Sequence, residues 1–295
     1  MKGGIRYIKR SNLDVSKYDA CIRNAKNSKI YAYSWYLDIV AKHWDVLVLD
    51  DYKAVMPIPW RKKFCIKYIY TPVWTQQLGV FSGELILEPL VSRFIDAIPR
   101  KFKKTTIFLN DGNKVSNKNI TIRDNFVLPL DKDYDEIYQH FSKNRRQSLR
   151  KTKTPNVIIS QNHSSIFPFY IDYIIEKTGT EIRDLAILDN LLQVCYKKDK
   201  AFVVEARNRD DEIIGGAVFL IDNKRLYYLF SALSDEGKKK QAMSHIVVSI
   251  IKKYAGTDYI LDFEGSTVLG IASFFKSFGS INKSYYLFQK FSLFL

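Results

Sequence analysis

Two acidic residues in the last third of the chain have the types and the spacing needed to move a proton. Asp262 and Glu264 are separated by one phenylalanine at the end of a predicted strand, residues 259–263, and Gly265-Ser266 then opens a turn into a predicted helix. Ligands of α/β proteins bind where a strand ends and a helix begins. A carboxylate there can take a proton from an attacking ammonium group. The competing interpretation is that each acid caps a turn or fills a buried hydrogen bond.

Two adjacent glycines, Gly215 and Gly216, interrupt a second predicted strand, residues 213–222. Glycine inside a strand marks a bulge or the close approach of a ligand or another backbone. If the strand splays there, its backbone N–H groups could polarise a carbonyl. The competing interpretation is that the glycines make room for an aromatic neighbour such as Tyr228.

Positive charge is concentrated in an acid-free stretch of eleven residues, 143–153. Its six cations are Lys143, Arg145, Arg146, Arg150, Lys151 and Lys153. On the long helix predicted over residues 133–152, Arg146 and Arg150 share a face and repel each other, so a bound anion would be stabilising. The alternative is a solvated helix end, where the helix dipole favours cations.

Three consecutive lysines, Lys238, Lys239 and Lys240, precede a helix predicted over residues 241–254. Lysines at the start of a helix oppose its dipole unless an anion binds there. These lysines are therefore candidate phosphate ligands, with a solvated loop as the alternative.

The composition restricts the possible partners and compartments. A net charge of +15, from 46 basic and 31 acidic side chains, attracts nucleic acid, nucleotide phosphates or anionic lipid headgroups, or simply reflects a solvated basic surface. The three cysteines form no C-x-x-C pair, so we expect no disulfide framework, no metal site and a cytoplasmic location. No apolar run is long enough to span a bilayer and no signal peptide is evident, so any membrane contact would be peripheral.

The pattern of elements indicates an α+β fold built from a duplicated unit. In the second half we predict a strand, two helices, three antiparallel strands, a helix, a strand, a helix and a strand, at residues 157–160, 164–177, 184–197, 201–207, 213–222, 225–232, 241–254, 259–263, 268–277 and 283–291. The first half approximates this order with a weaker middle: strand 5–9, helices 14–24 and 34–43, strands 45–50 and 54–60, helix 88–98, strands 105–110 and 120–130. We therefore predict two domains, 1–130 and 131–295, with mixed, mostly antiparallel sheets flanked by helices.

The second half resembles the acyl-CoA N-acyltransferase (GNAT) fold, and its motifs look like the FemAB-like, or Fem-type aminoacyltransferase, branch. The matching segments are the basic stretch 143–151, Gly215-Gly216-Ala217, residues 262–266 and Phe275-Lys276-Ser277-Phe278-Gly279. The resemblance covers most of residues 133–295 and is at fold level over 1–130. It implies two tandem GNAT-like domains and the transfer of amino acids from aminoacyl-tRNA to peptidoglycan precursors.

Two features depart from these families. The glycine-rich loop that cradles the CoA pyrophosphate in GNAT enzymes corresponds here to residues 236–243, where the glycine spacing is lost. The coiled-coil arm of some Fem ligases has no counterpart between residues 160 and 201.

The resemblance implies an N-acyltransferase that uses acyl-CoA or aminoacyl-tRNA and an amine acceptor, possible acceptors including a cell-envelope precursor. Glu264 or Asp262 would be the base, and Lys276 would join the arginines and lysines named above in holding phosphates. The alternative is a non-catalytic basic protein that binds nucleic acid or an anionic sugar-nucleotide or lipid-linked precursor.

Overall fold

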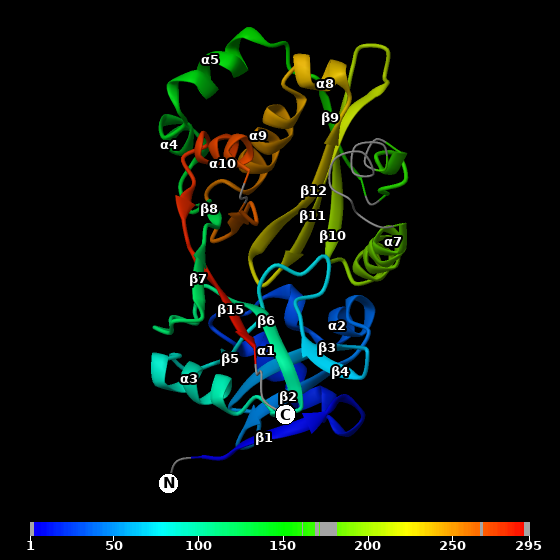
Figure 1. Ribbon diagram of the computed structural model, residues 1–295. Coiled ribbons are helices and arrows are strands. Elements are labelled where there is room, and N and C mark those ends of the chain that lie inside the picture. The colour runs from blue at the N-terminus through cyan, green and yellow to red at the C-terminus, as the bar shows by residue number, and fades with distance from the viewer. Residues whose placement is uncertain (1–2, 161, 169–170, 172–181, 266–267, 292–295) are drawn as a thin grey trace. The chain divides into compact units, whose positions relative to one another are not determined.

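The protein is described by a computed structural model that covers all residues except 1–2, 161, 169–170, 172–181, 266–267 and 292–295 (Figure 1). The chain forms two compact units. The first unit comprises Met1–Arg123 and Ser284–Leu295, and the second unit comprises Asp124–Lys283. Within the described residues, no helix is both long enough and apolar enough to cross a membrane.

The sheet of the first unit has the strand order β1-β2-β3-β4-β6-β15-β7, with β5 paired to β3. Neighbouring strands are antiparallel except β4 and β6, which are parallel. The strands are β1 (Ile5–Lys9), β2 (Trp44–Leu49), β3 (Ala54–Lys63), β4 (Ile66–Ile69), β5 (Phe81–Ser82), β6 (Phe102–Leu109), β7 (Ile120–Arg123) and β15 (Tyr285–Phe291). The helices are α1 (Val15–Asn24), α2 (Ser34–Val40) and α3 (Glu88–Asp96), with short 3-10 turns at Arg10–Asn12 and Ile30–Ala32.

The start of α1 illustrates how the sequence sets an element of this unit. Asp14 caps the helix, because its side chain accepts a hydrogen bond from the Lys17 backbone N–H. One face of the helix then buries Tyr18 and Ile22 completely. The Tyr18 hydroxyl donates to the Ala32 carbonyl at 2.6 Å, so the buried phenol is satisfied.

The sheet of the second unit has the order β14-β8-β13-β12-β11-β10-β9, and its one parallel pair among the described residues is β12 with β13. The strands are β8 (Phe126–Pro129), β9 (Asn156–Ser160), β10 (Ala201–Arg207), β11 (Ile213–Asp222), β12 (Arg225–Leu233), β13 (Ile260–Asp262) and β14 (Ile281–Asn282). The helices are α4 (Tyr134–Gln139), α5 (Lys143–Lys151), α7 (Ile182–Lys197), α8 (Asp235–Lys239), α9 (Ala242–Tyr254) and α10 (Leu269–Lys276).

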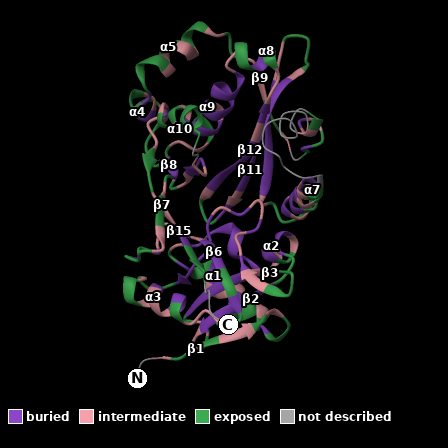
Figure 2. Ribbon diagram, in the orientation of Figure 1, coloured by how far each residue is buried: buried purple, intermediate pink, exposed green. Residues whose placement is uncertain are grey.

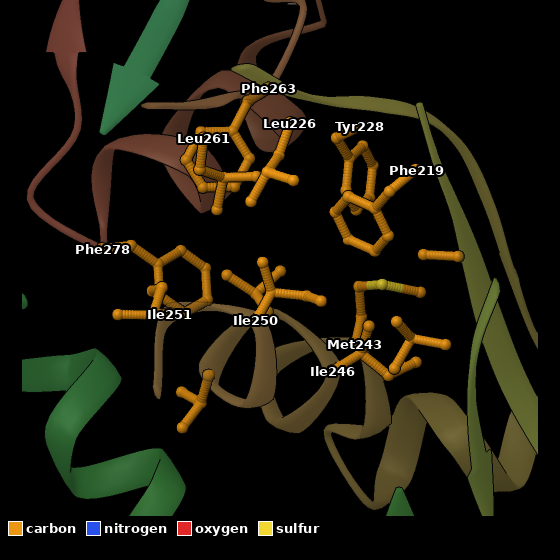
Figure 3. Close-up of a cluster of buried hydrophobic side chains, with 14 of the residues drawn as sticks. Phe219, Leu226, Tyr228, Met243, Ile246, Ile250, Ile251, Leu261, Phe263 and Phe278 are labelled. Carbon is orange, nitrogen blue, oxygen red and sulfur yellow. The ribbon is translucent and has the colours of Figure 1, made fainter. Parts of the chain in front are cut away.

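The core of the second unit lies between α9 and the sheet. Figure 3 shows the α9 side chains pointing toward aromatic and aliphatic side chains of β11, β12 and the end of β13. The labelled side chains are Phe219, Leu226, Tyr228, Met243, Ile246, Ile250, Ile251, Leu261, Phe263 and Phe278. Figure 2 shows how burial differs between the elements of this unit: β11, β12 and α9 are largely buried, whereas α5 is exposed or half-buried. The hydrophobic core is therefore formed by the sheet and α9, and the basic helix α5 contributes no buried residue to it.

The two sheets share one plan and exchange a strand. Each has four antiparallel strands, then a parallel neighbour, then two more strands. In the first sheet the place next to the parallel neighbour is taken by β15, and in the second sheet by β8. Each of these strands follows the edge strand of one unit along the chain and joins the sheet of the other unit. The structure thus has the expected α+β fold with two GNAT-like domains.

This exchange corrects the predicted domain boundaries. The predicted domains were 1–130 and 131–295, but β8 pairs with β13 and β14, and the residues after Ser284 pair with β6 and β7. The segment predicted as one strand over 120–130 is therefore two strands in different sheets, and the final strand, predicted at 283–291, leaves the second unit. Backbone pairing with distant partners, which has no local signal, sets both boundaries.

The long helix predicted over 133–152 is also wrong, because the structure has two helices, α4 and α5. Ser142 begins α5 by accepting a hydrogen bond from the Arg145 N–H, at 3.2 Å, and its own N–H donates to the Ser277 carbonyl at 2.9 Å. Gly279 packs against His140, where a Cβ would lie 2.9 Å from the His140 Cβ. Residues 277–279 therefore occupy the place where a continuous helix would run.

Several other predicted elements are confirmed. Strands 5–9, 201–207 and 213–222 have the predicted limits, and 225–232 is extended by one residue. The helix predicted at 164–177 falls largely outside the described residues.

Candidate functional site

The parallel pair β12 and β13 separates after three residues. Arg225, Leu226 and Tyr227 pair with residues 260–262, and β12 then continues to Leu233 with β11 as its partner on the other side. No described strand pairs with this part of β12 on the β13 side. The register also shifts between Val218 and Phe219 opposite this point. β12 and β13 thus diverge beyond Tyr227, where the side chains of Leu229, Phe230 and Ala232 are buried.

Asp262, one of the two predicted bases, is a structural residue. Its side chain is about 1% exposed, forms an ion pair with Arg225 at 2.7 Å, and accepts hydrogen bonds at 3.0 Å from Asn125 and from the Glu264 N–H. These contacts use both carboxylate oxygens and fix the turn after β13. The prediction that Asp262 acts as a base is therefore not supported by its geometry, and the turn-capping alternative describes it.

Glu264 follows at a point where the backbone is unusual. It has φ of 59° and Gly265 has φ of 67°, so two consecutive residues adopt the left-handed conformation. A non-glycine residue in this region is strained, and such strain is concentrated at functional sites. At Gly265 a Cβ would lie 2.2 Å from the Asp124 carbonyl oxygen, so only glycine fits. Glu264 is half-buried and is the remaining candidate base.

Gly215 and Gly216 do not lie at the splayed edge. They lie near the start of β11, paired with Ala206 and Glu205 on one side and with β12 on the other. A Cβ on Gly216 would lie 2.4 Å from Cγ2 of Ile166, and one on Gly215 would lie 2.3 Å from Cδ2 of Leu233. Their backbone groups belong to the sheet and the glycines make room for aliphatic side chains, so the packing alternative describes them and their binding role stays a prediction.

Arg145, at the start of α5, is held by neutral partners. Its Nε donates to the Ser277 hydroxyl at 3.0 Å, and its Nη1 donates to the Ser244 hydroxyl and to Gln241 Oε1. The guanidinium lies 4.7 Å from the ring centroid of Phe274 and 4.8 Å from that of Phe278. Burial lowers its pKa, and among the described residues no carboxylate pairs with it.

The beginning of α9 adds to this positive field. Gln241 precedes the helix in the left-handed conformation, with φ of 55°, and provides no side-chain cap. The first turn contains no acidic residue. The N–H groups of a helix start attract anions, so Arg145 and the start of α9 together are a candidate anion site.

The three lysines predicted to lie at the start of α9 lie instead at the end of the preceding helix, α8. Lys238 and Lys239 end α8, where the helix dipole stabilises them, and Lys240 follows as its C-cap. Lys238 pairs with Asp235 at 2.7 Å, and Lys240 pairs with Glu236 at 2.5 Å. The predicted conflict with a helix start is therefore absent.

Lys239 and Lys240 nevertheless line an open cavity of about 640 Å³. Five of its lining residues are cations, and Asp211 is its one acid. The cations come from the segment after α5, from the β10–β11 hairpin and from α8, and are Lys153, Arg207, Arg209, Lys239 and Lys240. Lys238 does not line it. Within the protein Arg207 pairs with Glu205 and Asp211, and Lys240 pairs with Glu236, so Lys153, Arg209 and Lys239 contribute most of the net positive charge of this basic cavity.

The remaining predicted phosphate ligands are distributed over two elements. Arg146 and Arg150 lie on α5, half-buried and exposed respectively, and neither has an ion pair among the described residues. Lys276 ends α10, is exposed, and lies 5.1 Å above the Phe126 ring. The structure brings Arg145 into the anion site and Lys239 and Lys240 into the basic cavity.

Sequence reasoning missed the neutral residues around Arg145, namely Gln241, Ser244, Phe274 and Ser277. Ser277 belongs to the motif that carried the family resemblance, and this was the one available signal for it. His245 was also missed: it is buried, and its Nε2 is 2.9 Å from the Thr152 hydroxyl. No group of acidic, histidine or cysteine side chains in the described part of the chain could hold a metal ion.

At the level of sequence, no protein-family model and no curated protein matches the chain. Solved structures do match it. FemX has a TM-score of 0.66 at 14% identity, over 95% of this chain and 96% of FemX. The carboxy-terminal domain of a protein from Agrobacterium fabrum assigned as a lysylphosphatidylglycerol synthetase has a TM-score of 0.56 at 12% identity, over 94% and 90% of the two chains. L-PGS from Bacillus licheniformis has a TM-score of 0.53 at 10% identity, over 93% and 90%.

These similarities extend over both units of the chain. The chain therefore has a tandem GNAT-like fold, which it shares with FemX.

Proposed function

We propose that the second unit transfers an acyl or aminoacyl group from an activated, phosphate-bearing donor to an amine. The observation that carries this proposal is the candidate anion site, in which the Arg145 guanidinium contacts Gln241 and Ser244 at the start of α9. In the GNAT fold the helix that corresponds to α9 meets the donor's phosphates. A half-buried guanidinium without a carboxylate is costly on its own, and an anionic ligand offsets that cost.

The charge distribution favours a donor with many phosphates. The cations of α5 have no acidic neighbour in the helix, which at nine residues is roughly 13 Å long. The basic cavity adds five more cations. The single pyrophosphate of CoA would contact only a few of these cations, whereas the phosphates of a nucleic-acid backbone can contact many of them. We therefore favour aminoacyl-tRNA over acyl-CoA as donor, in keeping with the likeness to FemX and to lysylphosphatidylglycerol synthetases.

The chemistry is acyl transfer by direct attack. The acceptor nitrogen forms a bond to the carbonyl carbon, and the bond from that carbon to the ribose oxygen of the tRNA, or to the sulfur of CoA, then breaks. The proton leaving the nitrogen passes to Glu264, and the departing oxygen or sulfur takes up a proton. Backbone N–H groups of β12, beyond the point where it diverges from β13, stabilise the oxyanion. The acceptor is an amine on an anionic molecule such as a cell-envelope precursor.

The test compares donors and one substitution. Charged tRNA and acetyl-CoA are titrated separately onto the full chain, and Arg145→Met is compared with Lys197→Met, an exposed cation at the end of α7. We expect tighter, strongly salt-dependent binding of tRNA, and about tenfold or more weaker binding for Arg145→Met alone. Mass spectrometry of amine acceptors incubated with each donor detects transfer.

The outcomes separate the alternatives. Tighter binding of acetyl-CoA reverses the choice of donor. Equal donor affinity of the two variants contradicts the site. Tight binding of tRNA without any transferred product favours the non-catalytic binding protein. The structural reason would be that the buried Phe263 ring packs against the Tyr228 ring of β12 and leaves no room there for a substrate.

A further inference from the structure

The hairpin that joins β3 to β4 ends in an exposed apolar tip. Lys63 pairs with Ile66, so Phe64 and Cys65 form a two-residue loop. The Phe64 side chain is 87% exposed and Ile66 is 52% exposed, and Cys65 is exposed as well. The tip lies where β3 and β4 meet in the first unit (Figure 1). Large apolar side chains gathered at one projecting point indicate an interaction site.

The backbone of this loop is strained by its residue types. Phe64 has φ of 46° and Cys65 has φ of 64°, so both central residues have the positive φ that a type I′ turn requires. Such turns strongly prefer Asn-Gly, and a bulky residue at positive φ is an outlier. Phe64 therefore costs stability at a position where it has almost no packing. A strained and unpacked aromatic residue points to a function outside the folded chain.

A ring of positive charge surrounds the apolar tip. Arg61, Lys62, Lys63 and Lys67 flank it, and the sequence from residue 52 to residue 83 contains no acidic residue. In the described structure none of these four forms an ion pair. Their nearest partners are rings: the Arg61 guanidinium lies 4.2 Å from the centroid of Tyr70, and Lys67 Nζ lies 4.5 Å from that of Trp60. The charges are thus available to an external anion.

We propose that this hairpin anchors the protein to an anionic phospholipid bilayer, with Phe64 and Ile66 entering the interface and the lysines contacting lipid phosphates. Peripheral anchoring needs both an apolar and an electrostatic contribution, and the hairpin carries both. The long lysine side chains can reach the headgroups while the tip lies deeper. The competing occupant, single-stranded nucleic acid, would stack on Phe64 but would leave Ile66 without a suitable partner.

The test measures vesicle binding by co-sedimentation of the full chain. Vesicles of phosphatidylglycerol and phosphatidylcholine in equal parts bind the protein, and vesicles of phosphatidylcholine alone do not. Phe64→Ser weakens binding about tenfold, because the buried ring is lost. Lys62→Gln with Lys63→Gln weakens it about fivefold for each lysine. The matched controls, Leu85→Ser and Lys114→Gln with Lys118→Gln, change exposed residues of the same unit and alter binding less than about twofold.

Fluorescence reports insertion directly. Burial raises the pKa of Cys21 to about 11 and that of Cys195 to about 12, so near neutral pH a thiol-reactive dye labels Cys65. We expect a blue shift of the dye with phosphatidylglycerol vesicles, and none in a protein with Cys65→Ser and Leu85→Cys labelled at position 85. Wild-type affinity of Phe64→Ser, or no dye shift, overturns the proposal. Phe64-dependent binding of single-stranded RNA without vesicle binding overturns it in favour of nucleic acid.

Discussion

The Arg145 side chain donates to the Ser277 hydroxyl at 3.0 Å and so joins residues 132 positions apart in the chain. Ser277 gives its own proton to the Phe274 carbonyl at 2.6 Å, so its oxygen is free to accept from Arg145. A serine positions the guanidinium without neutralising it, as an aspartate would. The positive charge therefore stays available to a ligand at the start of α9.

The positive charge of Arg145 also acts on His245, and the free energy of unfolding therefore depends on pH. Burial, then the positive charges of Arg145 and Lys252, lower the pKa of His245. The Thr152 hydroxyl donates to the Ser148 carbonyl, so His245 donates to Thr152 from Nε2. A lowered folded pKa means that the unfolded chain binds more protons, so this contribution is complete above the unfolded pKa of about 6.5 and declines as pH falls. Urea unfolding as a function of pH measures this decline.

Two variants test this cause. His245→Gln removes the titrating group and should reduce the acid-side slope. Arg145→Met should raise the pKa of His245 toward its ordinary value, followed by NMR of the imidazole ring. A slope that is the same in wild type and His245→Gln would assign the acid sensitivity to other groups.

Replacing Asp262 should lower the free energy of unfolding, because this side chain has a structural role and not a catalytic one. Asp262→Asn leaves the nearly buried Arg225 without its carboxylate, and we expect a loss of about 3 kcal/mol in the free energy of unfolding. Urea denaturation measures it. Asp258→Asn, which breaks the exposed pair with Lys224, serves as the control and should have little effect. An unchanged midpoint for Asp262→Asn would mean that the turn after β13 does not depend on this ion pair.

Glu264→Gln tests the proposed base. The amide has the same size and tolerates the left-handed backbone no worse, so the unfolding midpoint should stay the same. Loss of proton transfer should lower turnover about a hundredfold at unchanged donor affinity. Steady-state kinetics with a verified donor and acceptor make the measurement, and full turnover in this variant would remove Glu264 from the mechanism.

Gly216→Ala tests the packing role of the glycine pair. The added methyl would overlap Cγ2 of Ile166, and overpacking of this kind costs about 1–3 kcal/mol. Ile166→Ala removes the overlapping group, so the double variant should be less destabilised than the sum of the single variants. Additive effects in urea denaturation would mean that the nearby Val204 carbonyl oxygen, 3.2 Å from the position of the added methyl, is the main obstacle.

The sequence predicted the elements that local chemistry determines. The limits of β10 and β11 agree with prediction because apolar strands end at turn residues, among them Asp211 and Asn223, both at positive φ. The helix break before α5 was missed because Ser142 and Gly279 create it together from distant positions.

The site was predicted less completely than the fold, for a similar reason. Gln241, Ser244 and Ser277 meet Arg145 from 96 to 132 residues away, and none of them has a charge or a spacing that marks it. Asp262 has a side chain that can act as a base. Its ion pair with Arg225 depends on the register between β12 and β13, which a single sequence does not reveal.

The reciprocal strand exchange has a consequence for how the chain folds during synthesis. The first unit is translated first, but its sheet has a gap between β6 and β7 until the residues after Ser284 leave the ribosome. The second unit, which begins at Asp124, already has β8 when β13 emerges. The order of completion is therefore the reverse of the order of translation, and the edges of β6 and β7 that pair with β15 lack this partner until β15 has been synthesised.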